Sequence, residues 1–214
     1  MTLRLYYHPL SSFCWKALIA LYEKGVAFEP QLVDFSDPAQ DAAFRKMWPI
    51  RKFPVLRDEA EDRLVPESSI IIEYIDQKFP GGTRLIPADP AQAREMRFRD
   101  RFFDLYVHIP MQKVIGDRLR PDDKRDPFGV EQAKEQIETS YRMLDQQVDA
   151  RRWVMGDDFS MADCAALPAL FYGNMVVPFG EHRNVTAYFE RLKRRPSIAR
   201  VIGEAEPYFK YVPQ

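Results

Sequence analysis

Hydrophobic and polar positions follow two different periods near the start of the chain. Leu3–Tyr7 is a short run of residues that favour strands, and the apolar residues of Phe13–Lys24 fall on one helical face. Gly25 stands where that helix would end, because glycine readily adopts the left-handed conformation that closes a helix. The pattern therefore predicts a strand, a turn and a helix in that order.

The alternation of strands and helices continues up to residue 79. The next predicted elements are Val26–Val33, Ala39–Met47, Val55–Arg57, Arg63–Val65 and a helix from about Glu67. Pro30 favours an edge position for its strand, because proline cannot donate to a sheet ladder. The acidic stretch Asp58–Asp62 lies between two strand-like runs and predicts the turn of a hairpin. The predicted order is βαβαββα.

Strand signals end after a segment that is rich in proline and glycine. We expect residues 1–79 to form an α/β domain, 80–90 a linker, and 91–214 an all-helical domain. The first helix beyond the linker carries apolar residues at helical spacing, which predict its inward face: Phe98, Phe102, Leu105, Tyr106 and Ile109.

Composition narrows the classes of function. Hydrophobic residues make up 46% of the chain and the net charge is -1, so no basic field points to nucleic acid. The basic run Arg191–Arg195 is interpreted as a solvated helix face. Met1–Leu5 begins no apolar leader and no stretch reaches membrane-spanning length, so we expect a cytoplasmic protein without a membrane partner. The scattered cysteines and histidines predict no metal site.

Ser11-Ser12-Phe13-Cys14 lies where the first strand gives way to a helix. A serine here caps the helix, or it donates its hydroxyl to a bound thiolate, which the helix N-terminus also stabilises. Cys14 is either a small buried hydrophobe or a reactive thiol. Tyr7 offers a phenol donor at the end of the strand. The spacing is that of a redox Cys-x-x-Cys motif with serine in the first position, which cannot form a disulfide there.

Two further segments suit the other parts of a thiol peptide. Pro54 precedes a strand, where a cis bond would leave the Phe53 backbone free to pair with an extended peptide; an ordinary trans proline is the alternative. Glu67 and Ser68 open a helix whose amides could bind a carboxylate, although an acidic helix start is common. Ser160–Asp163 has the pattern of a capping box, with a structural role.

Together these segments resemble the cytosolic glutathione S-transferase family over essentially the whole chain. The resemblance rests on Ser11–Cys14, Lys52-Phe53-Pro54-Val55-Leu56, Glu67-Ser68 and Ser160–Asp163, in order and at the family's spacing. It implies a thioredoxin-like N-terminal domain followed by a helical bundle, and an enzyme that conjugates glutathione to a hydrophobic electrophile. It also implies glutathione as co-substrate, no metal, and a homodimer.

The resemblance further implies a role for individual residues. Pro54 would be cis, the Phe53 backbone would pair with the cysteinyl part of glutathione, and Glu67 and Ser68 would bind the γ-glutamyl end. Arg51 or Lys52 would lie near the glycine carboxylate. Ser11 is the expected activator of the sulfur, with Ser12 as second choice and Tyr7 near the tyrosine that other classes use.

An electrophile pocket is expected between the domains, with these walls: Leu10, Phe13, Phe102, Tyr106, His108, Phe171 and Tyr172. Two other functions remain open at this point. One is a glutathione-dependent thiol–disulfide reductase that uses Cys14. The other is a non-catalytic glutathione-binding or regulatory protein on the same fold, because a fold does not fix a function.

Overall fold

The computed structural model describes residues 2–212. Its first part contains the predicted βαβαββα order: β1 (Leu3–Tyr7), α1 (Ser12–Lys24), β2 (Glu29–Leu32), α2 (Pro38–Met47), β3 (Val55–Asp58), β4 (Arg63–Pro66) and α3 (Ser68–Lys78). β2 is shorter than predicted. Gly25 closes α1 at φ 63°, as expected, and its N–H reaches back to the carbonyls of the last turn.

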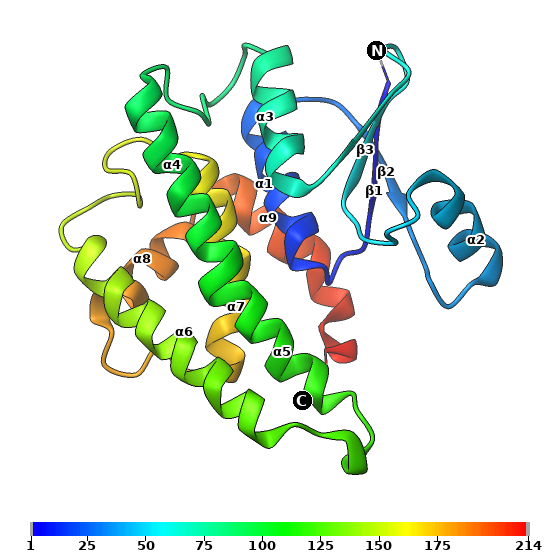
Figure 1. The fold of residues 1–214 in the computed structure, drawn as a ribbon. Coiled ribbons are helices and arrows are strands. Elements are labelled where there is room, and N and C mark those ends of the chain that lie inside the picture. The colour runs from blue at the N-terminus through cyan, green and yellow to red at the C-terminus, as the bar shows by residue number, and fades with distance from the viewer. Residues whose placement is uncertain (1, 213–214) are drawn as a thin grey trace.

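The four strands form one mixed sheet in the order β2-β1-β3-β4. β1 pairs in parallel with β2 and antiparallel with β3, and β3–β4 is the predicted hairpin. Pro30 lies in β2, which is an edge strand as predicted, and a residue without an N–H is tolerated there. Helices α1 and α3 cover the face of the sheet that is turned toward the other helices, and α2 lies on the opposite side (Figure 1).

The rest of the described chain is helical, which confirms the thioredoxin-like domain followed by a helical domain. Its elements are α4 (Pro90–Phe102), the π-helical segment η1 (Phe103–His108), α5 (Ile109–Arg118), η2 (Asp122–Lys124), α6 (Pro127–Gln147), α7 (Met161–Val176), α8 (Arg183–Lys193), α9 (Pro196–Ala205) and η3 (Glu206–Tyr211). Helix α7 begins with the predicted capping box, in which Asp163 accepts from the N–H of Ser160 at 2.8 Å.

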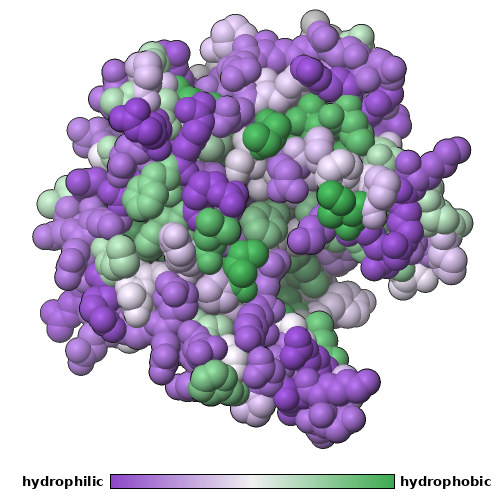
Figure 2. Space-filling model, in the orientation of Figure 1, coloured by the Kyte–Doolittle hydropathy of each residue, from purple (hydrophilic) through white to green (hydrophobic). Residues whose placement is uncertain are grey.

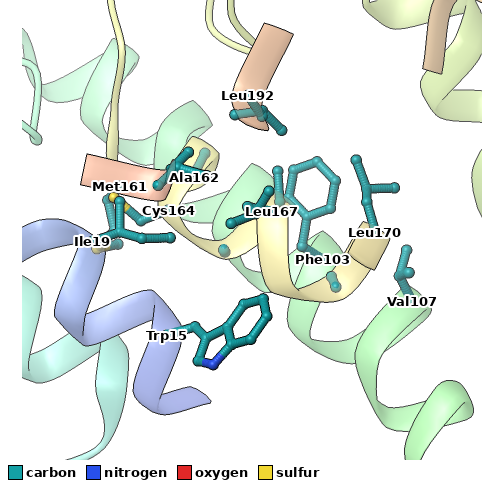
Figure 3. Close-up of a cluster of buried hydrophobic side chains, with 14 of the residues drawn as sticks. Trp15, Ile19, Phe103, Val107, Met161, Ala162, Cys164, Leu167, Leu170 and Leu192 are labelled. Atoms are coloured by element: carbon teal, nitrogen blue, oxygen red, sulfur yellow. The ribbon is translucent and has the colours of Figure 1, made fainter. Parts of the chain in front are cut away.

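One hydrophobic core joins the two domains. Figure 3 shows Trp15 and Ile19 of α1 beside residues of α7, with Phe103 and Val107 of η1 on its other side. All of these side chains are buried. α7 is buried on nearly every face, as expected for a helix that is hydrophobic all round. A smaller cluster of Val33, Phe44 and Val55 fills the space between the sheet and α2.

The π-helical segment has a local cause. Pro110 has no N–H, so the carbonyl of Tyr106 loses its donor within the helix. The Ser140 hydroxyl of α6 donates to this carbonyl at 2.9 Å instead. The N–H of Ile109 bonds to the carbonyl of Asp104, five residues back, which widens the turn. α4, η1 and α5 therefore follow one another without a break but with an altered register.

This register corrects the predicted inward face. Leu105, Tyr106 and Ile109 are 41–48% exposed, as is Phe98 at 47%. Asp100, Asp104 and His108 are buried in their place. Residues four apart stay on one side of the widened turn, and that side faces α1.

Candidate functional site

A cleft of about 670 Å³ lies between the two domains. It brings together the start of α1, the cis-proline loop, the start of α3, and the wall formed by α4, η1 and α5. Its lining includes Ser11, Phe13, Phe35, Arg51, Lys52, Phe53, Pro54, Glu67, Ser68, Ile70, Asp100, Arg101, Asp104, Leu105, Ile109 and Gln112. Hydrophobic residues gather in the middle of the same face of the molecule, between the front helices and the sheet (Figure 2).

Ser11 is the N-cap of α1 and faces this cleft. Its hydroxyl oxygen accepts the N–H of Cys14 at 3.4 Å, and the side chain is half-buried. An oxygen that accepts from the helix still has its own proton to donate. The neighbouring Cys14 thiol also interacts with this hydroxyl, but a protonated thiol is a weak acceptor. A thiolate bound in the cleft would be a stronger acceptor for the same proton.

Ser12 is placed differently. It is 6% exposed, is absent from the cleft lining, and its hydroxyl is hydrogen bonded to Nε2 of His108 on the helical domain. Burial, together with a smaller effect of the nearby Lys16 charge, lowers the pKa of His108 to about 3, so the imidazole is neutral. The Ser12 hydroxyl is thus engaged inside the protein.

The other candidates for a sulfur contact also lie away from the cleft. Cys14 is fully buried, and burial raises the pKa of its thiol to about 12, so it stays protonated. Burial likewise raises the pKa of Tyr7. Its side chain lines a separate pocket on the other side of α1, next to Tyr22 and Glu204.

The Phe53–Pro54 bond is cis, as the family resemblance implied. Both residues line the cleft, and the Phe53 ring stacks on Phe35 at 5.0 Å. Arg51 donates to Asp41 at 2.5 Å and also lies over the Phe35 ring. Lys52 is exposed at the cleft and forms no ion pair with any residue of the described range. Lys52 is therefore a cation at this loop that is open to a ligand.

The start of α3 is strained and open. Glu67 is its N-cap at φ 71°, a conformation that is costly for a residue with a side chain. The Glu67 carboxylate makes no capping hydrogen bond and lines the cleft. Ser68, the first residue of α3, is buried and also lines the cleft. The N-terminus of α3 therefore lies at the cleft together with the Glu67 carboxylate and the Ser68 hydroxyl.

A buried charged cluster that the sequence did not suggest lies under the cleft. The ammonium of Lys16 contacts Asp100 at 2.7 Å, Asp104 at 2.8 Å and the Ser69 hydroxyl at 2.8 Å. Burial raises the pKa of Asp104, and the charge of Asp100 adds to this rise against the attraction of Lys16. The spacing of four between Ser12 and Lys16, and between Asp104 and His108, was the only signal of this cluster in the sequence.

The structure places one of the expected pocket walls at the cleft and the others elsewhere. Phe13 lines the cleft. Phe102 and His108 are buried in the interior, and Tyr106 points outward at 45% exposed. Leu10, Phe171 and Tyr172 lie around Trp15 beyond the cleft, where the Tyr172 hydroxyl donates to the Leu10 carbonyl. The apolar walls that replace them are Phe35, Ile70, Leu105 and Ile109.

Between residues 2 and 212 no helix is both long enough and apolar enough to cross a membrane. The same range holds no group of histidine, cysteine and acidic side chains arranged to bind a metal ion.

Comparison with known proteins gives consistent matches. Residues 5–83 match the family model "Glutathione S-transferase, N-terminal domain", and residues 109–196 match "Glutathione S-transferase, C-terminal domain". Protein LigF of Sphingobium sp. is 39% identical, over 96% of this chain and 95% of LigF. The stringent starvation protein A homolog of Histophilus somni is 26% identical, over 95% of this chain and 91% of that protein.

A solved structure adds a bound ligand to these matches. The glutathione S-transferase of Methylobacterium radiotolerans, in complex with glutathione sulfonate, superposes with a TM-score of 0.81 at 26% identity. The match covers 94% of this chain and 95% of the other.

Proposed function

Because the chain belongs to the glutathione S-transferase family, we propose that it ionises the thiol of glutathione and transfers it to a hydrophobic electrophile, with Ser11 as the activating hydroxyl. The observation that carries this proposal is the contrast between the two serines. Ser11 lines the cleft, whereas the Ser12 hydroxyl is buried and bonded to His108.

The chemistry follows from the start of α1. Glutathione would lose its thiol proton to water, and the resulting thiolate would accept the Ser11 O–H. The partial positive charge at the helix N-terminus favours the same ionised form. The thiolate then attacks a carbon of the electrophile, so that an S–C bond forms while the leaving group departs with its electron pair. In an addition, the electron pair passes to the neighbouring atom, which takes a proton from water.

The rest of the cleft offers matching sites for the tripeptide. The Phe53 backbone beside cis-Pro54 would pair with the cysteinyl amide. Ser68 and the amides of α3 would bind the γ-glutamyl carboxylate, and the free Glu67 carboxylate would bind its ammonium. Lys52 would meet the glycine carboxylate, and we prefer it to Arg51, which is held by Asp41.

The electrophile would occupy the apolar part of the cleft. Phe13 of the first domain faces Leu105 and Ile109 of the second, and such walls suit a small hydrophobic molecule. We further propose that the protein works as a cytoplasmic homodimer, and that its domains are bounded at 1–79 and 91–214 with a linker at 80–90. Sedimentation of the pure protein tests the dimer.

The activating role is tested by titrating the thiolate absorbance of glutathione bound to the protein. We expect a bound-thiol pKa below the ordinary thiol value in the wild type and a rise of at least about one unit in Ser11→Ala. The matched control is Tyr7→Phe, which removes the phenol in the other pocket and should leave the titration unchanged. An unshifted Ser11→Ala would remove Ser11 from the role.

Turnover is measured separately on the same proteins. Conjugation of a panel of hydrophobic electrophiles is expected in the wild type and should fall in Ser11→Ala. Tight glutathione binding without conjugation of any electrophile would contradict the transferase proposal and support a non-catalytic binding protein.

A further inference from the structure

Two polar rungs connect α1 to the helical domain. The first is the hydrogen bond between Ser12 and His108, and the second is the ion pair of Lys16 with Asp104. Ser12 and Lys16 are four residues apart on α1, and Asp104 and His108 are four residues apart on η1. The helices therefore run in opposite directions along this contact, and both rungs lie in the buried interface between the domains.

The hydrogen bond between Ser12 and His108 lies next to the proposed activator, because Ser12 directly follows Ser11. His108 is 1% exposed and neutral, so it binds no ligand and carries no charge to the sulfur. It bonds to the residue that follows Ser11, however, and its ring also stacks on Phe13 with centroids 4.0 Å apart and planes within 7°. His108 of the second domain therefore contacts both Ser12 and Phe13, the first two residues of α1.

This placement matters because the effect of a helix terminus is short-ranged. The stabilisation of an anion falls off within the first turn, so a small displacement of that turn changes it. A hydroxyl donor is equally sensitive to position, since a hydrogen bond weakens steeply as its angle departs from linear. The start of α1 holds both the Ser11 hydroxyl and the first helix amides.

We propose that His108 is a positioning residue for the transfer reaction: through Ser12 and Phe13 it fixes the first turn of α1 where the Ser11 hydroxyl and the helix amides meet the sulfur of glutathione. The role rests on the proposed function. It also explains why a histidine is buried at the interface, where a hydrocarbon side chain would pack without a polar group to satisfy.

His108→Phe tests the role, because it keeps a ring against Phe13 and removes the bond to Ser12. We expect the pKa of the bound glutathione thiol to rise by about half a unit to one unit. kcat should fall at a pH below that pKa, with little change in KM for glutathione, because the binding groups on α3 are untouched. His108→Gln, which keeps a hydrogen-bonding group near the position of Nε2, should restore most of the wild-type thiol pKa.

Two more variants guard against a general loss of structure. Ser12→Ala removes the same bond from the other side with a smaller change, and its effect should not add to that of His108→Phe. His182→Phe removes a histidine that bonds to Glu138 at 2.8 Å within the helical domain, and it should leave the thiol pKa unchanged.

The outcomes separate the two proposals. A wild-type protein that lowers the thiol pKa, together with folded His108→Phe and Ser12→Ala proteins that lower it equally, would overturn the positioning role alone. A wild-type protein that does not lower the thiol pKa at all would overturn the proposed activation and this role with it.

Discussion

The Lys16 ammonium lies 2.7 Å from the carboxylate of Asp100, and each side chain keeps 1% of its surface exposed. The carboxylate of Asp104 shares the same ammonium at 2.8 Å. Asp104 also has Arg101 at 3.7 Å, but Lys16 is the buried cation that both carboxylates share. A buried charge that loses its partner is strongly destabilising. Removing the Lys16 charge from the interface between the domains should therefore lower the stability of the protein strongly.

Lys16→Met should lower the free energy of unfolding by about 3–5 kcal/mol. Lys24→Met is the matched control, because Lys24 is also buried but pairs with a single carboxylate, Asp76, at 3.0 Å. Asp76 also accepts the N–H of Leu85, so it keeps a partner after the change. Urea unfolding at neutral pH should show the larger loss for Lys16→Met, and equal losses would contradict this account.

Asp58 gives the protein a stability that depends on pH. Burial raises the pKa of this carboxyl, but hydrogen bonds from Lys78, Tyr74 and the Glu61 N–H outweigh burial and lower the pKa to about 2. The folded pKa lies below the ordinary 3.8. The resulting stability is present above pH 4 and is lost as the pH falls toward 2.

Asp58→Asn should therefore reduce the free energy of unfolding by about 2 kcal/mol at pH 6. The difference from the wild type should shrink as the pH falls below about 4. Asp62→Asn, at the exposed tip of the same hairpin, serves as the control and should change the stability by less than about 0.5 kcal/mol. A difference for Asp58→Asn that stays constant between pH 6 and pH 3 would be inconsistent with the lowered pKa.

Ser11 caps a helix and faces the cleft, and one substitution separates these roles. Glycine is a good N-cap, so Ser11→Gly should cost only a few tenths of a kcal/mol, whereas Ser11→Ala should cost about 1 kcal/mol. Both lack the hydroxyl, so both should raise the pKa of the bound glutathione thiol equally. If the Ser11→Gly protein titrates like the wild type, the hydroxyl serves the helix alone.

The two cysteine thiols should not react with thiol reagents in the folded protein. Cys14 and Cys164 are fully buried, and burial raises the pKa of both thiols. An aromatic disulfide reagent at pH 8 should release almost no coloured product from the native protein and should modify both thiols in urea. Fast reaction of Cys14 in the native state would revive the thiol–disulfide reductase hypothesis.

Most of the fold could be predicted from local sequence patterns. β1, the closing turn of α1 at Gly25 and the β3–β4 hairpin follow from residues that are close in sequence, so period and turn chemistry were sufficient. β2 was predicted too long because Val26 and Ala27 are apolar without belonging to the ladder. Apolar character alone does not tell whether the backbone has a partner strand.

The inward face of the helix that follows the linker could not be predicted in the same way. Hydrophobic periodicity assumes that apolar residues are buried, but here Asp104 and His108 are buried because Lys16 and Ser12 satisfy them from a distant segment. The π-helical turn also changes the register. Two of the expected electrophile walls, Phe102 and Tyr106, belong to that helical face, and the structure buries the first and exposes the second.

The side chain of Trp15, which belongs to α1 of the first domain, is buried against α7 of the second. Its indole N–H donates to the Pro9 carbonyl at 2.5 Å. A hybrid that joined this N-terminal half to the helical half of a relative would need a matching space for the indole. Without that space, the start of α1 would be displaced together with its tryptophan. The two domains therefore have to match at this tryptophan, and the position of Ser11 depends on both of them.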